Sequence, residues 1–242
     1  MNTSSVSRNS GNQSESRSGR ILVWDAPVRL FHWLFAACFA GAWLTAESES
    51  WRLVHITLGY TAGGLLVFRL AWGIVGTKYA RFSSFVRGAR RVWRYLADLL
   101  RGHPQRHVGH NPAGAVAIIA MIAAASFLIV SGWAGYNDVG GNWMEELHEV
   151  LAYVMLSFIA VHIAGVIVSS WIHRENLIGA MVTGRKSGGA HEGIARSCRN
   201  IAAVMAVAVL AFWWWQWQAA PSPVTAGGNA AAAHQTHRDG AD

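Results

Sequence analysis

The sequence predicts an all-α membrane protein, in which four transmembrane helices form a bundle and a fifth, C-terminal transmembrane helix follows. Of its 242 residues, 52% are hydrophobic and only 14% are charged, whereas about a quarter of the residues in soluble domains are charged. Five apolar stretches are long enough, at about 1.5 Å per helical residue, to cross roughly 30 Å of hydrocarbon. The predicted spans are residues 28–46, 53–76, 113–135, 147–172 and 201–219.

The first span follows a polar N-terminal segment. Residues 1–20 are rich in Ser, Asn and Gly, and we expect disorder there because such a segment buries too little apolar surface to offset the entropy cost of ordering. Asp25 is a candidate helix N-cap, and Pro27 suits the first helical turn. The apolar stretch lies far from Met1 and has no clear cleavage site, so we interpret it as a retained anchor helix and not as a signal peptide.

The second span carries Gly59, Gly63 and Gly64, which leave room for a neighbouring helix or a flat ligand. Before the third span, apolar residues recur at helical spacing among arginines in residues 89–102. This segment is either an amphipathic helix on the inner leaflet or a solvated basic helix that docks on the bundle.

The distribution of charge predicts the orientation of the spans. Segments 1–29, 78–112 and 173–200 hold 17 of the 20 Lys and Arg residues, so the positive-inside rule places them, with the N-terminus, in the cytoplasm. The outer segments carry carboxylates instead, at Glu47, Glu49, Asp138, Glu145, Glu146 and Glu149. The sequence pI of about 10.1 therefore reflects loop charges, and we expect the lipid bilayer and no nucleic acid as a partner.

These patterns divide the chain into five parts. They are a disordered cytoplasmic N-terminus (1–20), a transmembrane domain (21–175), a cytoplasmic linker (176–200), the fifth transmembrane helix (201–219) and a flexible outer tail (220–242). Within the tail, His234 and His237 are only a weak indication of metal binding. We expect no disulfide between Cys38 and Cys198, which lie toward opposite sides of the bundle.

Four of the eleven histidines, namely His32, His55, His148 and His162, lie within predicted spans. A single histidine there is as compatible with an interhelical hydrogen bond as with ligation. However, His148 and His162 are 14 residues apart, a rise of about 21 Å that returns to nearly the same helix face. The helix directions then place His32 with His162 near the inner side and His55 with His148 near the outer side.

Two facing neutral imidazoles at each depth predict a cofactor iron between them. Six-coordinate haem iron fits such a pair better than zinc, which favours four ligands, although structural zinc is an alternative. The sequence has no C-x-x-C-H motif for covalent haem attachment. Because two histidines leave no open iron position, we expect electron transfer and not oxygen activation.

Two arginines are candidates for holding haem propionates. Arg69 lies near the inner end of the second span and Arg29 near the start of the first. A cation in the bilayer is costly and could be stabilised by a propionate. The alternative is that both side chains extend to lipid phosphates.

Four segments of the chain carry a family resemblance. They are WDAPVRLFHW, WRLVHITLGY, FRLAWGIVGTKYARFSSF and ELHEVLAYVMLSFIAVHIAG. Over residues 21 to about 175, the chain resembles the bacterial cytochrome b561 family, which includes the b-type cytochrome subunits of nickel-iron hydrogenases. The resemblance implies a four-helix haem core with ligands at His32, His55, His148 and His162, and electron exchange with quinone. The fifth span departs from the shorter family pattern, and we expect it to dock a partner or stabilise an assembly.

The leading hypothesis is therefore a conduit with two haem b groups in a bacterial inner membrane, with its N-terminus cytoplasmic and its C-terminus periplasmic. It would pass electrons between membrane quinone and a hydrogenase, a dehydrogenase or a c-type cytochrome. We propose no acid, base or nucleophile. One alternative is a self-contained oxidoreductase that oxidises superoxide and reduces quinone, which the acidic outer face disfavours. Another is a metal or proton transporter that uses the same histidines and would be colourless.

Overall fold

The computed structural model describes residues 19–85, 94, 109 and 112–219. Five helices in this part of the chain are long and apolar enough to cross a membrane, and each overlaps one predicted span. They are α1 (Ala26–Thr45), α2 (Arg52–Val75), α4 (Pro112–Tyr136), α5 (Trp143–His173) and α7 (Arg199–Ala219). The predicted fold class, an all-α membrane protein, is confirmed.

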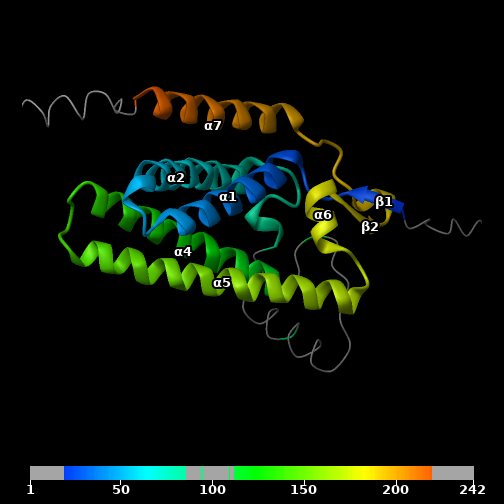
Figure 1. The fold of residues 1–242 in the computed structure, drawn as a ribbon. Helices are drawn as coiled ribbons and strands as arrows, with labels where there is room; N and C mark the ends of the chain where they lie inside the picture. The colour runs from blue at the N-terminus through cyan, green and yellow to red at the C-terminus, as the bar shows by residue number, and fades with distance from the viewer. Residues whose placement is uncertain (1–18, 86–93, 95–108, 110–111, 220–242) are drawn as a thin grey trace, which may run out of the picture.

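The long helices are arranged in layers (Figure 1). Helices α1 and α2 pack along each other as one hairpin, α4 and α5 pack as a second, and α2 contacts α4 between them. Helix α7 lies on the α1/α2 hairpin, on the side away from α5. The four-helix bundle therefore consists of α1, α2, α4 and α5, with α7 as an outer addition.

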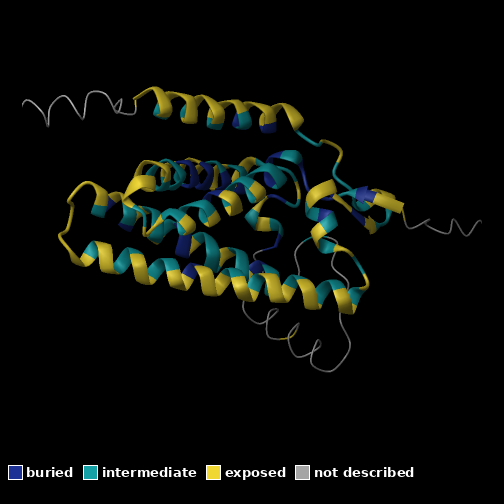
Figure 2. Cartoon of the chain, viewed as in Figure 1, coloured by how far each residue is buried: buried dark blue, intermediate teal, exposed yellow. Residues whose placement is uncertain are grey.

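The surface of the long helices is apolar. Figure 2 shows exposed residues along the outward faces of α5 and α7, whereas buried residues face the inside of the bundle. Large side chains such as Trp171 (82% exposed) and Trp217 (80% exposed) project outward. Such a surface would be costly in water but suits hydrocarbon, so the protein is a multi-pass membrane protein.

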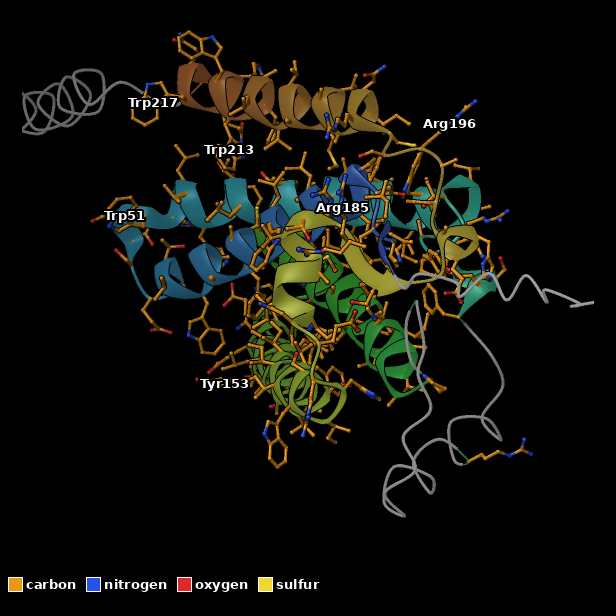
Figure 3. All side chains as sticks on the ribbon, turned by 90° about the vertical axis from the view of Figure 1, so that its right-hand side faces the viewer. Trp51, Tyr153, Arg185, Arg196, Trp213 and Trp217 are labelled. Carbon is orange, nitrogen blue, oxygen red and sulfur yellow. The ribbon has the colours of Figure 1, made fainter. Side chains whose placement is uncertain are left out.

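Side-chain hydrogen bonds tie α7 to α2. The Trp213 indole Nε1 donates to Thr61 Oγ1 at 2.9 Å, and Gln216 Nε2 lies 3.5 Å from Thr57 Oγ1. In Figure 3, Trp213 points from α7 toward the α1/α2 layer. Met205 of α7 packs into a buried cluster with Cys38 of α1. Helix α7 is thus fixed to the hairpin that it covers.

Asp25 joins the start of α1 to the end of α2. Its Oδ1 accepts from the Val28 backbone N–H at 2.8 Å, as predicted for an N-cap. Its Oδ2 accepts from Trp72 Nε1 at 3.0 Å and from Thr77 Oγ1 at 2.6 Å. The carboxylate is only 1% exposed, so these donors replace water as its partners.

We expect Asp25→Ala to destabilise the protein by about 2–4 kcal/mol, because it removes a helix cap and leaves the half-buried donors of Trp72 and Thr77 without an acceptor. The measurement is the apparent unfolding temperature in detergent. Asp25→Asn is the matched control, since its amide oxygen still accepts one of the three bonds, and it should lose less. Equal stability of Asp25→Ala and the wild type would contradict this role.

A small sheet lies at the end of the bundle that the charge pattern predicts to be cytoplasmic, which we call the inner end. Strand β1 (Gly19–Leu22) pairs antiparallel with β2 (Arg185–Gly188), from Gly19↔Gly188 to Leu22↔Arg185. Helix α6 (Leu177–Thr183) precedes β2. Its Ala180 packs in a buried cluster with Ile21, Val23 and Trp24. Residues 176–200, predicted as a linker, therefore include ordered elements.

The turn from α6 into β2 requires a glycine. Gly184 has φ +79°, and a Cβ there would lie 2.6 Å from the Trp24 carbonyl oxygen. The carbonyl oxygen of Gly184 accepts hydrogen bonds from the backbone N–H groups of Val23, at 2.8 Å, and Trp24, at 3.1 Å. This turn therefore attaches the segment after α5 to the start of α1.

Some predictions fall outside the described residues. They are the basic helix over residues 89–102, of which only Arg94 is described, and the tail at 220–242 with His234 and His237. Disorder was predicted over residues 1–20. Of these, residues 1–18 lie outside the described part of the chain, whereas Gly19 and Arg20 belong to β1.

Candidate functional site

The four membrane histidines lie in two facing pairs. His32 of α1 faces His162 of α5 with ring centroids 6.5 Å apart. His55 of α2 faces His148 of α5 with ring centroids 6.3 Å apart. The structure thus brings together the pairs that the sequence analysis expected. We call His32/His162 the inner pair and His55/His148 the outer pair, after the predicted orientation.

Helix α5 sets the distance between the two pairs. It is continuous from Trp143 to His173, so its two histidines are separated by about 21 Å of rise. Met155 lies midway between them on the same face and is 3% exposed. It packs in a buried cluster with Leu66, Ala124 and Ala125, against which Phe35 and Phe39 also pack. An apolar layer therefore separates the two pairs.

The outer histidines are oriented by backbone carbonyls. His55 Nδ1 lies 2.9 Å from the Ala42 carbonyl oxygen, and His148 Nδ1 lies 3.0 Å from that of Leu128. Because a carbonyl oxygen can only accept, Nδ1 must carry the hydrogen in both rings. Nε2 then keeps its lone pair, which is the form of histidine that binds a metal. Ser131 Oγ is a further neighbour of His148 Nδ1, at 3.3 Å.

A cavity of about 720 Å³ lies at the outer pair, and both of its histidines line it. Its lining is mainly apolar and includes Phe35, Phe39 and Gly59. A Cβ on Gly59 would meet nothing within 4 Å, so this part of α2 leaves open space beside the histidines. The volume falls within the range of about 300–1,000 Å³ that is usual for cofactor and ligand sites.

Gly132 of α4 allows the close approach of the His148 ring. A Cβ at this position would lie 2.6 Å from His148 Cε1 and 2.9 Å from its Nδ1. Any larger residue would therefore have to displace the ring. Sequence analysis missed both Gly132 and Met155, although the position of Met155 seven residues from each histidine was a detectable signal.

The inner pair has a different hydrogen-bonding environment. His32 Nδ1 is buried and has no hydrogen-bond partner among the described residues. The edge of its ring contacts Trp33, with centroids 5.0 Å apart. A buried polar atom without a partner costs free energy and calls for an explanation, which ligation of a cofactor at this ring would provide.

The donor set and its spacing fit haem. A metal–imidazole nitrogen bond is about 2.0–2.1 Å long, so an iron between two aligned rings would set their centroids about 6–6.5 Å apart. Both observed centroid distances, 6.5 and 6.3 Å, agree with this value. Within the described part of the chain, no three His, Cys, Asp or Glu residues are grouped as a metal site would need. This composition disfavours four-coordinate zinc.

Arg69 and Arg29 both have protein partners at the inner end. Arg69 is 4% exposed, donates from Nη1 to the Ala80 carbonyl at 3.2 Å, and lies 4.8 Å above the Phe82 ring. Arg29 Nη1 donates to the Val182 carbonyl at 2.6 Å. Arg69 is thus enclosed by protein and does not extend to lipid. A bond from either residue to a propionate stays a prediction.

Comparison with known proteins identifies the family. Residues 23–184 match the family model described as prokaryotic cytochrome b561. The chain belongs to this family. The resemblance found in the sequence is therefore confirmed, and the protein is a b-type cytochrome, an electron-transfer protein whose cofactor is haem b.

Several curated proteins are similar along most of their length. One is the probable Ni/Fe-hydrogenase B-type cytochrome subunit of Azotobacter vinelandii, 26% identical over 74% of this chain and 94% of that protein. Another is the probable Ni/Fe-hydrogenase 1 B-type cytochrome subunit of Escherichia coli K12, 24% identical over 68% of this chain and 90% of that protein. A third, the probable Ni/Fe-hydrogenase B-type cytochrome subunit of Rhodobacter capsulatus, is 21% identical over 72% of this chain and 84% of that protein. No solved structure gives a significant match.

Proposed function

We propose that this cytochrome holds two haem b groups and carries electrons between membrane quinone and a nickel-iron hydrogenase. The observation that carries the proposal is the pair of facing histidines at each of two depths, with centroids 6.5 and 6.3 Å apart. His32 and His162 would bind the inner haem, and His55 and His148 the outer haem. When bound, haem b supplies reversible one-electron transfer at its iron.

The surrounding residues orient the ligands and exclude water. The carbonyls of Ala42 and Leu128 hold the outer rings through Nδ1, which would leave the Nε2 lone pairs to bind the haem. Met155 and the residues packed on it keep the space between the pairs apolar. Each haem would be held by two histidines, and a haem held in this way would supply electron transfer and not oxygen activation.

The proposed partner comes from the names of the relatives. They are described as probable subunits of Ni/Fe-hydrogenases, and this chain aligns with most of their length. Quinone is the second partner that the family resemblance implies. Residues of the chain supply no hydrogen-oxidising chemistry of their own in this proposal, so the cytochrome acts as an electron-transfer subunit and not as a free-standing enzyme.

The proposed location is the bacterial inner membrane, with the N-terminus in the cytoplasm and the C-terminus in the periplasm. Most Lys and Arg residues lie in the segments next to Pro112 of α4, His173 of α5 and Ala26 of α1, as the positive-inside rule requires. The opposite end carries the acidic residues Glu145 and Glu146 in the first turn of α5. Hydrogenase would therefore dock at the acidic, periplasmic end.

We expect the purified protein to contain two haem b per chain. A pyridine haemochrome assay counts the haem, and a reduced-minus-oxidised visible spectrum identifies it as low-spin and b-type. The reason is that each of the two histidine pairs would hold one haem. A colourless protein would refute the proposal and favour the metal or proton transporter, and a single haem would refute one of the pairs.

A further inference from the structure

We propose that helix α6 lies in the membrane interface and that the arginines at its two ends, Arg174 and Arg185, bind the headgroups of anionic phospholipids. The ligand is the phosphate of a lipid such as phosphatidylglycerol, with the apolar side chains of α6 against its acyl chains. This surface lies outside both histidine pairs, so the inference holds or fails independently of the proposed function. The depth of α6, its exposed apolar face and the charge around it support the proposal.

Helix α6 lies at the level where α5 leaves the apolar layer. The Leu177 backbone N–H at the start of α6 donates to Ser170 Oγ at 3.4 Å, so the chain folds back alongside the last turn of α5, which ends at His173. Trp171, the neighbour of Ser170, is 82% exposed, and exposed tryptophans favour the boundary between hydrocarbon and headgroups. The start of α6 is therefore at this boundary.

Helix α6 has one packed face and one exposed apolar face. Ala180 is 2% exposed and packs in the buried cluster that includes Trp24. Ile178 and Val182 are four residues apart and hence lie on one face, and their side chains are 54% and 57% exposed. Large apolar side chains directed outward are costly in water. They suit an interfacial helix, whose apolar face enters the region between headgroups and acyl chains.

Exposed arginines lie at both ends of α6. Arg174 is the C-cap of α5 and precedes α6, and Arg185 begins β2 directly after Gly184. The Arg185 backbone N–H donates to Thr183 Oγ1 at 3.3 Å, which keeps this residue at the last turn of α6. Figure 3 faces this end of the molecule and shows Arg185 beside α6. A guanidinium carries five donors in a geometry that matches phosphate oxygens.

Carboxylates do not offset these charges at the surface. Within residues 19–29, 74–85 and 170–200 of the inner end, the carboxylates are Asp25, Glu175 and Glu192, and none of them is exposed. Asp25 is buried, Glu175 pairs with the buried Lys186 at 3.3 Å, and Glu192 accepts a backbone N–H at 2.8 Å. The exposed cations in the same ranges are Arg20, Lys78, Arg81, Arg174, Arg185, Arg196 and Arg199. This surface therefore attracts anionic headgroups.

A phospholipid fits the surface better than an acidic polypeptide does. Between the two arginines, α6 directs aliphatic side chains outward, at Ile178 and Val182. A phospholipid supplies an anionic phosphate and apolar acyl carbon next to each other, which matches both parts of this surface. An acidic polypeptide matches only the arginines, and it would have to displace headgroups from the boundary.

The test is EPR spectroscopy of spin-labelled lipids in bilayers that contain the full-length protein. Phosphatidylglycerol and phosphatidylcholine with the same labelled chain report how strongly each lipid associates with the protein. We expect phosphatidylglycerol to associate about two- to fivefold more strongly with the wild type. Salt at about 1 M should remove most of this preference, because the Debye length is then about 3 Å.

Charge variants locate the lipid site. Arg174→Gln combined with Arg185→Gln should lower the preference for phosphatidylglycerol about twofold. Arg174→Lys with Arg185→Lys should keep most of it, because the charge is preserved. The matched control is Arg52→Gln, since Arg52 is an exposed arginine at the opposite end of the bundle and its charge is already offset by Glu49 at 3.4 Å. This control should leave the preference unchanged.

A nitroxide label at position 182 tests the depth of α6. Val182→Cys is labelled in a Cys198→Ala background, because the other cysteine, Cys38, is buried. We expect the label to collide more often with oxygen, which partitions into the membrane, than with a water-soluble nickel chelate. The reverse order would place α6 in water and overturn its interfacial position.

The remaining outcomes decide the lipid partner. Equal association of both lipids with the wild type, or an unchanged preference in the double Gln variant, would overturn the proposal and leave this surface to an acidic protein partner. All variants should keep the haem content of the wild type, because α6 lies outside both histidine pairs. If the double Gln variant loses its haem through misfolding, the wild-type preference and its salt dependence decide the question.

Discussion

Replacing His148 with alanine is expected to reduce the haem content from two to one per chain, with the outer haem lost and the inner haem retained. His148 faces His55 across the outer site, and a haem held there without a covalent bond would depend on both imidazoles. The inner pair lies about 21 Å away along α5, beyond the Met155 layer. The measurement is the pyridine haemochrome count with the reduced-minus-oxidised spectrum.

Reciprocal variants make this prediction sharper. His162→Ala should remove the inner haem and keep the outer one, so the two variants should lose different spectral components. The matched control is His191→Ala, because His191 lies in the short helix Ala190–Glu192 at the inner end and outside both pairs. Both haems intact in His148→Ala would contradict the pairing.

The membrane helices and the pairing of histidines were accessible from the sequence. Helical periodicity alone places His148 and His162 on one face of α5, and span directions determine which histidines share a depth. These are properties of single helices crossing a layer of fixed thickness. Residue preferences at helix starts predicted Asp25 as the N-cap, and the 2.8 Å bond from Val28 N confirms this.

The hydrogen bonds around the histidines could not be predicted in this way. The acceptors for His55 and His148 are backbone carbonyls of Ala42 and Leu128, and a carbonyl is present at every residue. Which one meets the ring depends on how α1 packs on α2 and how α4 packs on α5. The role of Gly132 depends on the same packing.

The inner sheet was missed for a related reason. Strands β1 and β2 have four residues each, too few for a reliable alternation pattern. Their pairing joins the segment before α1 to the segment after α6. A buried cluster that includes Trp24 and Ala180 stabilises this pairing. Arg29 was expected at a propionate or a lipid phosphate, and that stays a prediction. Its hydrogen bond to the Val182 carbonyl could not be foreseen, because it depends on where α6 lies relative to the start of α1.

A single methyl group at Gly132 is expected to remove most of the outer haem. In Gly132→Ala, the new Cβ would lie 2.6 Å from His148 Cε1 and 2.9 Å from its Nδ1, closer than non-bonded atoms approach. The ring must rotate or shift, which breaks the 3.0 Å bond to the Leu128 carbonyl and moves the ring from its place opposite His55. The expected result is one haem per chain by the pyridine haemochrome assay, with the spectrum of His148→Ala.

The control for this effect is one helical turn away. Gly135→Ala adds the same methyl group to α4, but its Cβ would lie 3.6 Å from Glu145 Cγ, an ordinary contact distance. That variant should keep both haems, so a loss specific to Gly132→Ala cannot arise from altered helix propensity, which is the same for both substitutions. Two haems in Gly132→Ala would mean that α4 moves to accommodate the methyl group, and that the fixed position of the His148 ring is not required for haem binding.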